Sequence, residues 1–78
     1  MRHESIAEAI ERYLLRHPAA ADSDVGIAEW WLLEQGLRAP LADVRAALEL
    51  LAHRGVMENV TLHDGRSLWR PVRRAPGA

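Results

Sequence analysis

The sequence contains no cysteine, so no disulfide can stabilise the fold of this 78-residue chain. A domain of this length buries only about 60% of the surface that its unfolded chain exposes, and its core is therefore marginal. The fold must rest on the packing of its apolar residues, which make up 49% of the chain, or on packing against a partner. The absence of cysteine is compatible with a cytoplasmic location, which we expect.

Long hydrophobic runs are missing as well. Nowhere do about eighteen apolar residues follow one another, so we expect no membrane-spanning segment. Residues 1–10 alternate charged and apolar side chains, which is unlike the continuous apolar core of a signal peptide. We therefore expect no membrane partner.

Lysine is also absent, and ten arginines face eleven carboxylates for a net charge of -1. This near-neutral sum argues against the strong phosphate attraction of a dedicated nucleic-acid binder. The distribution is uneven, because residues 18–38 hold four carboxylates against one arginine and residues 55–78 hold four arginines against two carboxylates. The acidic segment lies mid-chain and the basic one at the end.

A first helix is predicted from Ser5, because Ser5 and Glu8 have the spacing of a capping box. Its apolar residues recur at helical spacing and form one stripe: Ile6, Ala9, Ile10, Tyr13 and Leu14. Pro18 disfavours helical geometry at His17, so we expect the helix to end there or one turn sooner.

A second helix is predicted to begin at Asp22 or Ser23 and to end at Gly36, a natural C-terminal cap. Gly26 in its first turn suggests the close approach of another backbone. The adjacent residues Trp30 and Trp31 point about 100° apart, so both cannot lie at the centre of one buried stripe. We expect one of them at the edge of the core, half exposed.

The longest predicted helix runs from Pro40, at its first helical position, to Arg54, and Gly55 ends it. Its buried face carries Leu41, Val44, Ala47, Leu48 and Leu51.

Asp64 and Gly65 then predict a two-residue hairpin turn between strands 56–62 and 66–72. With that turn, Val60 stands opposite Trp69, Thr61 opposite Leu68 and Leu62 opposite Ser67. Four residues are then expected on the face that covers the helices: Val56, Val60, Leu62 and Trp69. Pro71 indicates that its strand is at an edge or already ending, and residues 73–78 are expected to form a flexible tail.

The run from Leu48 to Met57, followed by the turn at Asp64 to Arg66 and by Leu68 to Arg70, resembles the third helix and wing of winged helix-turn-helix domains. The resemblance covers residues 5–72 and implies an α+β fold, with three helices followed by a two-stranded hairpin, the wing. It also places a short third strand near residues 19–21, whose small side chains could run extended. In DNA-binding members the third helix enters the major groove, which by position would turn five residues toward DNA: Asp43, Ala46, Glu49, Leu50 and His53. Arg66 would lie at the tip of the wing.

This outer face is poorly suited to reading DNA, because base edges are contacted mostly by arginine, lysine, asparagine and glutamine. The face offers two carboxylates, Asp43 and Glu49, which phosphates would repel. The residues left for a nucleic-acid contact are arginines on its flanks, in the wing and in the tail: Arg45, Arg54, Arg66, Arg70, Arg73 and Arg74.

No catalytic or cofactor motif stands out, so we expect no enzymatic activity, no cofactor and no small-molecule substrate. Two serines sit where helix caps belong, and none lies in a nucleophile-elbow motif. No two of the four histidines have helical i, i+4 spacing and no cysteine joins them, so we expect no metal site.

The tryptophan pair is the sharpest functional signal. Both residues can simply belong to the core, or one can anchor a protein partner, since large aromatic residues dominate interface hot spots. The carboxylates of residues 22–34 can likewise be a solvated face or a docking surface. The interaction surface expected from these patterns contains Trp30, Trp31, Glu34, Ala46, Glu49, Leu50 and His53.

We therefore hypothesise a non-enzymatic winged-helix protein-interaction module that either homodimerises or docks onto a larger partner. The alternative is a small DNA-binding transcriptional regulator in which the third helix and the arginines make the contacts.

Overall fold

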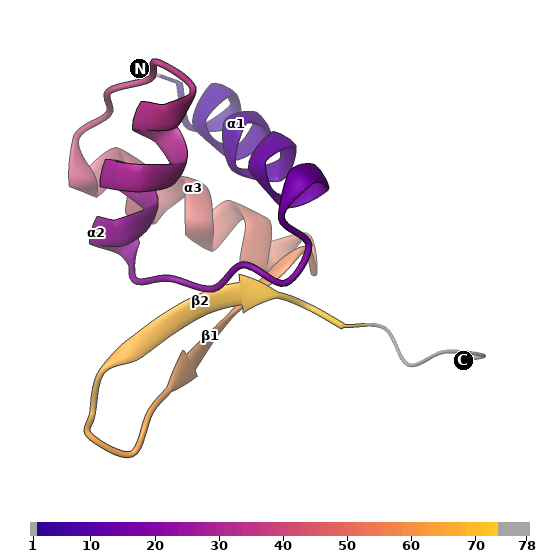
Figure 1. Ribbon diagram of the computed structural model, residues 1–78, viewed down its shortest axis with the longest axis vertical. Coiled ribbons are helices and arrows are strands. Elements are labelled where there is room, and N and C mark those ends of the chain that lie inside the picture. Colours follow the sequence, from indigo (N-terminus) through magenta and orange to yellow (C-terminus); the bar gives the residue numbers. More distant parts are fainter. Residues whose placement is uncertain (1, 74–78) are drawn as a thin grey trace.

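The computed structural model describes residues 2–73. Helix α1 (His3–Arg16) is followed by α2 (Asp24–Gly26), which continues into the π-helical segment η1 (Ile27–Leu32). Helix α3 (Leu41–His53) leads into a hairpin of β1 (Met57–Thr61) and β2 (Ser67–Pro71) (Figure 1). With α2 and η1 counted as one helix, this is the predicted α+β order of three helices and a two-stranded antiparallel hairpin.

The core lies where the three helices meet, and the hairpin closes one side of it (Figure 1). The predicted stripe of α1 supplies Ile6, Ala9 and Ile10, all fully buried. The buried side chains of η1 and α3 complete the helical part: Ile27, Trp31, Leu32, Val44, Ala47, Leu48 and Leu51. Each large aliphatic side chain stabilises the fold by about 1.5–3 kcal/mol on burial.

Helix α1 begins at His3, two residues before the predicted capping box, and Ser5 is exposed. The residue before it, Arg2, makes no capping hydrogen bond through its side chain. Instead, the first turn is attached to α3, because His3 Nε2 lies 3.2 Å from Asp43 Oδ1 and both oxygens of Glu4 accept hydrogen bonds from Arg54. These tertiary contacts extend the helix beyond the local capping signal. Its C-terminal end at Arg16 agrees with the prediction from Pro18.

Helix α2 is capped by Ser23, whose hydroxyl accepts a hydrogen bond of 3.0 Å from the amide of Gly26. The available space favours glycine here, because a Cβ atom would lie 1.9 Å from Oδ1 of Asp22 and that side chain would have to move. Its φ of -62° is open to any residue. The close neighbour is thus a side chain, and the predicted approach of another backbone was wrong.

The segment η1 was not predicted. In a π-helix hydrogen bonds close five residues apart, and each residue turns less than in an α-helix. Ile27, Trp31 and Leu32 therefore all reach the core, while Glu29 and Trp30 stay exposed.

Two of the expected glycines end helices in the left-handed conformation. Gly36 has a φ of +75°, and the amide of Leu37 donates back to the carbonyl of Leu32 across 2.9 Å. Gly55 has a φ of +72° and a matching bond from Val56 to Leu51 ends α3. Both caps confirm the predictions. Pro40, predicted inside α3, instead lies one residue before it with an extended ψ of 145°.

The hairpin register differs from the prediction by one residue. The pairs are Val60 with Leu68, Thr61 with Ser67 and Asn59 with Trp69. The cause is a three-residue loop: Leu62 donates to the carbonyl of Arg66, and Gly65, at a φ of +87°, donates to the carbonyl of Leu62. Because a slip of one residue exchanges the two faces of a strand, Trp69 covers the core together with Met57, which was not predicted, while Val60 lies on the other face.

A single β-bridge takes the place of the predicted third strand. Residues 19–21 form no strand, but the next residue, Asp22, pairs with Trp69 through hydrogen bonds of 3.1 Å and 2.8 Å. The loop after α1 therefore lies against β2 (Figure 1). Strand β2 ends at Pro71, as the proline indicated.

Candidate protein-interaction surface

The two adjacent tryptophans have opposite environments. Trp31 is 2% exposed and its ring stacks on Tyr13, with centroids 4.6 Å apart and planes 12° from parallel. Trp30 is 69% exposed. Only Trp30 is available to a partner, so the expectation that Trp31 contributes to an interaction surface was wrong. The prediction that one ring lies away from the core holds for Trp30.

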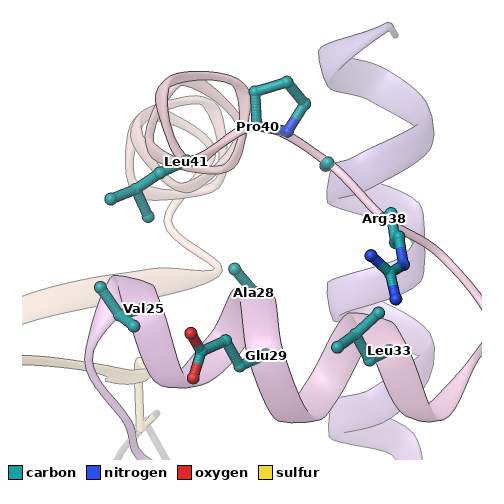
Figure 2. A pocket seen from close by; sticks show the side chains of 8 residues that line it. Val25, Ala28, Glu29, Leu33, Arg38, Pro40 and Leu41 are labelled. Carbon is teal, nitrogen blue, oxygen red and sulfur yellow. The ribbon is translucent and has the colours of Figure 1, made fainter.

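A cleft of about 650 Å³ opens between the second helix and the beginning of α3 (Figure 2). Its apolar lining comes from both walls and consists of Val25, Ala28, Leu33, Ala39, Pro40 and Leu41. Val25 and Leu33, on the same helix as Trp30, are 43% and 42% exposed. These side chains and Trp30 form the surface that we call the η1 surface.

Two opposite charges border this cleft. Glu29 extends from η1 on one wall, and Arg38 projects from the segment that connects the second helix to α3 on the other (Figure 2). Both are exposed, and neither takes part in an ion pair within residues 2–73. The cleft thus presents an apolar floor with one acid and one base at its edges.

The outer face of α3 is less apolar than predicted. Leu50 is half-buried and packs against the core, so it does not form an exposed patch with Ala46, which is itself half-buried. Asp43 faces α1 through its contact with His3. Glu49 and His53 are exposed, as is Glu34 at the end of the second helix. None of Glu34, Glu49 and His53 lines the cleft, although Glu34 lies on the helix that carries Trp30.

Most arginines proposed for nucleic-acid contact are engaged with carboxylates of this chain. Arg45 bonds to Asp24 across 2.6 Å and Arg54 to Glu4 across 2.7 Å. Arg66 and Arg70 bond to carboxylates of the hairpin, Asp64 and Glu58. Arg73 is exposed, and Arg74 lies outside the described residues.

These ion pairs shift three pKa values. The hydrogen bond from Arg54 lowers the pKa of Glu4, and the same contact raises the pKa of Arg54. The hydrogen bond from Arg45 lowers the pKa of Asp24. Each shift favours the charged form of both partners, so these contacts of α3 with α1 and α2 are between charged groups at neutral pH.

The four histidines are dispersed. His3 contacts Asp43, His17 lies against the ring of Tyr13 with centroids 4.4 Å apart, and His53 and His63 are exposed. Within residues 2–73, no three side chains of histidine, cysteine, aspartate or glutamate come together in a group that could hold a metal ion. In the same part of the chain, every helix falls short of the length and apolar character needed to cross a bilayer.

The sequence did not predict the cleft, because its walls come from two different segments, residues 25–33 and residues 38–41. One signal was present: Trp30 to Leu33 are four consecutive apolar residues, more than a single helical stripe can bury.

Comparison with known proteins adds no relative, since no family model, curated protein or solved structure matches this chain.

Proposed function

We propose that this chain is a non-enzymatic winged-helix module for protein interaction and that its partner binds at the η1 surface. The observation that carries the proposal is the exposure of Trp30 on the helix that forms one wall of an apolar cleft. A tryptophan in water leaves a large apolar area unburied, and contiguous apolar area on a small domain marks interaction sites. A cytoplasmic location belongs to the same proposal.

The shape of the surface supports a protein partner. Interface hot spots are enriched in tryptophan and arginine and lie in pockets that exclude water. Here Arg38 lines a cleft of about 650 Å³, and Trp30 is exposed on the helix that forms one of its walls. The two free charges at its edges can fix the orientation of a partner.

Replacing Trp30 with alanine tests the proposal. Because its ring is exposed, we expect Trp30→Ala to change the free energy of unfolding by less than about 0.5 kcal/mol. We expect the same substitution to abolish association, measured by sedimentation velocity for self-association and by affinity capture for other proteins.

Leu15 is a matched control, since it is an apolar side chain that is 84% exposed and belongs to α1, not to the helix that carries Trp30. Leu15→Ala should leave both stability and association unchanged. In contrast, Trp31→Ala should destabilise the domain by about 3–5 kcal/mol because it empties the core. The proposal fails if Trp30→Ala unfolds the protein or if it associates as well as the Leu15 control.

DNA binding is the second candidate function, favoured by the order of elements. A helix, a turn and α3 are followed by a hairpin whose exposed tip carries Arg66 (Figure 1). The residues on the outer side of α3 weaken this candidate, because Glu49 lies there and Arg45 is held by Asp24.

A further inference from the structure

We propose that the η1 surface is covered by a second copy of this chain, related to the first by a two-fold axis. This inference rests on the proposed function and names the partner. In such a contact each residue of one copy meets a residue of the other, and the same pair occurs again on the opposite side of the axis. A surface suited to this contact must therefore complement itself.

The charges at the cleft meet that requirement. Glu29 and Arg38 lie on opposite walls and are both without an ion-pair partner in the described part of the chain. A two-fold axis between the clefts brings Glu29 of one copy to Arg38 of the other, and the reverse pair forms at the same time. An unrelated partner would need its own matched acid and base, whereas a second copy supplies them automatically.

The apolar residues also satisfy the requirement that the surface complement itself. Trp30 follows Glu29 in η1 and is 69% exposed, but it does not line the cleft of its own copy. In the symmetric contact, Trp30 of each copy enters the cleft of the other between Val25 and Leu33. Both rings and both clefts then leave water, which supplies the main driving force for association.

Charge reversal tests this arrangement. Sedimentation equilibrium of the wild-type chain over a concentration series should show a monomer–dimer equilibrium. Glu29→Arg and Arg38→Glu each place like charges at both ends of the interface. Each should weaken the dimer by about tenfold or more. The double variant restores opposite charges and should dimerise within about threefold of the wild type.

A mixture of the two single variants gives an independent measurement. The acid and base are again paired at both ends when Glu29→Arg binds Arg38→Glu, so an equimolar mixture should form heterodimers more tightly than either variant forms homodimers. Glu49→Arg, an equal change of charge on an exposed residue outside the cleft, is the matched control and should dimerise normally. Thermal melts of all variants serve as the check that each variant is folded.

Three results would overturn the inference: a wild-type chain that stays monomeric, a double variant as weak as the single ones, or a Glu49 control that weakens as much. These results are distinct from a failure of the proposed function. A monomeric chain that binds another protein only when Trp30 is present would leave the interaction module standing and remove the second copy as its partner.

Discussion

Because Gly26 has no side chain, the carboxylate of Asp22 can lie against the first turn of the second helix. The space that a Cβ atom would take is occupied by the carboxylate of Asp22, which accepts a hydrogen bond of 2.8 Å from the amide of Ser23. In a helix interior alanine is favoured over glycine by about 1 kcal/mol, and less near an end. At this position the steric conflict opposes that preference.

We therefore expect Gly26→Ala to destabilise the protein by about 1 kcal/mol, because the Asp22 side chain must leave and its hydrogen bond is lost. Asp22→Ala removes the same hydrogen bond and also the obstacle. Urea unfolding of both single variants and the double variant gives the coupling between the two sites. The double variant should lose less free energy of unfolding than the sum of the losses in the two single variants. Simple additivity of these losses would contradict the steric explanation.

The tryptophan pair shows how far the sequence alone reaches at the scale of a residue. Helical geometry showed that Trp30 and Trp31 could not share one stripe, and this is confirmed. Which ring was exposed depended on the π-helical turns of η1, which bring both Trp31 and Leu32 to the core. Such turns depend on packing against α1 and α3, which a helical periodicity of 3.6 does not include.

At the scale of elements, two ion pairs fasten α3 to its neighbours. Arg54 reaches Glu4 of α1, and Arg45 reaches Asp24 of α2. Both carboxylates have a pKa below the ordinary values of 4.5 and 3.8. A group whose pKa is lower in the folded state stabilises the fold above its unfolded pKa, and this contribution is lost as the pH falls through the folded value.

We expect this effect in the acid stability of a Glu4→Gln variant. At about pH 7 the variant should unfold at a lower urea concentration than the wild type, because it lacks the charged contact to Arg54. As the pH falls from about 5 to about 3 the wild type loses the same contact, so the two midpoints should converge. Glu34→Gln, at an exposed carboxylate that forms no ion pair within residues 2–73, is the control. A difference between wild type and Glu4→Gln that persists at low pH would contradict the role of this pair.

The hairpin illustrates which features of an element the sequence could specify. Asp64 and Gly65 identified the turn, and the lengths of the strands were correct to within one residue at each end. The register was wrong because Asp-Gly also fits a three-residue loop, in which Gly65 alone takes a positive φ. Two further contacts favour that loop: Asp64 accepts hydrogen bonds from both the amide and the side chain of Arg66. The assignment of faces followed from the register, so Met57 was missed and Val60 was misplaced.

At the scale of the whole molecule, the distribution of charge favours the proposed protein interaction over DNA binding. The net charge is -1, and the arginines of α3 are paired with carboxylates of other helices. Non-specific DNA binding depends on free cations that release counterions from the phosphates. The structure describes few such cations on the side of α3 that faces away from its neighbours.

We accordingly expect no rise in fluorescence anisotropy when the chain is added to a labelled random duplex, up to about 100 µM protein in about 0.1 M salt. Titrations at lower salt and with Arg66→Ala belong to the same experiment. Micromolar binding that weakens steeply with added salt and on loss of Arg66 would favour the DNA-binding alternative instead.

The uneven distribution of charge along the chain was visible in the sequence, but the ion pairs that it forms within the molecule were not. The acidic middle segment and the basic end suggested contacts between molecules, whereas Asp24 and Glu58 are satisfied within this one. The cleft could not be predicted for the same reason: it forms where residues 25–33 meet residues 38–41 in space. Contacts between residues that are far apart in the sequence depend on the whole fold.

The bridge between Asp22 and Trp69 links two parts of the molecule mechanically. Trp69 belongs to the hairpin and to the core, while Asp22 immediately precedes the cap of the helix that carries the cleft. The hairpin cannot tilt as an independent arm without breaking two backbone hydrogen bonds and drawing an indole ring out of the interior. We therefore expect a displacement of the hairpin to be felt at the first turn of that helix, next to the cleft.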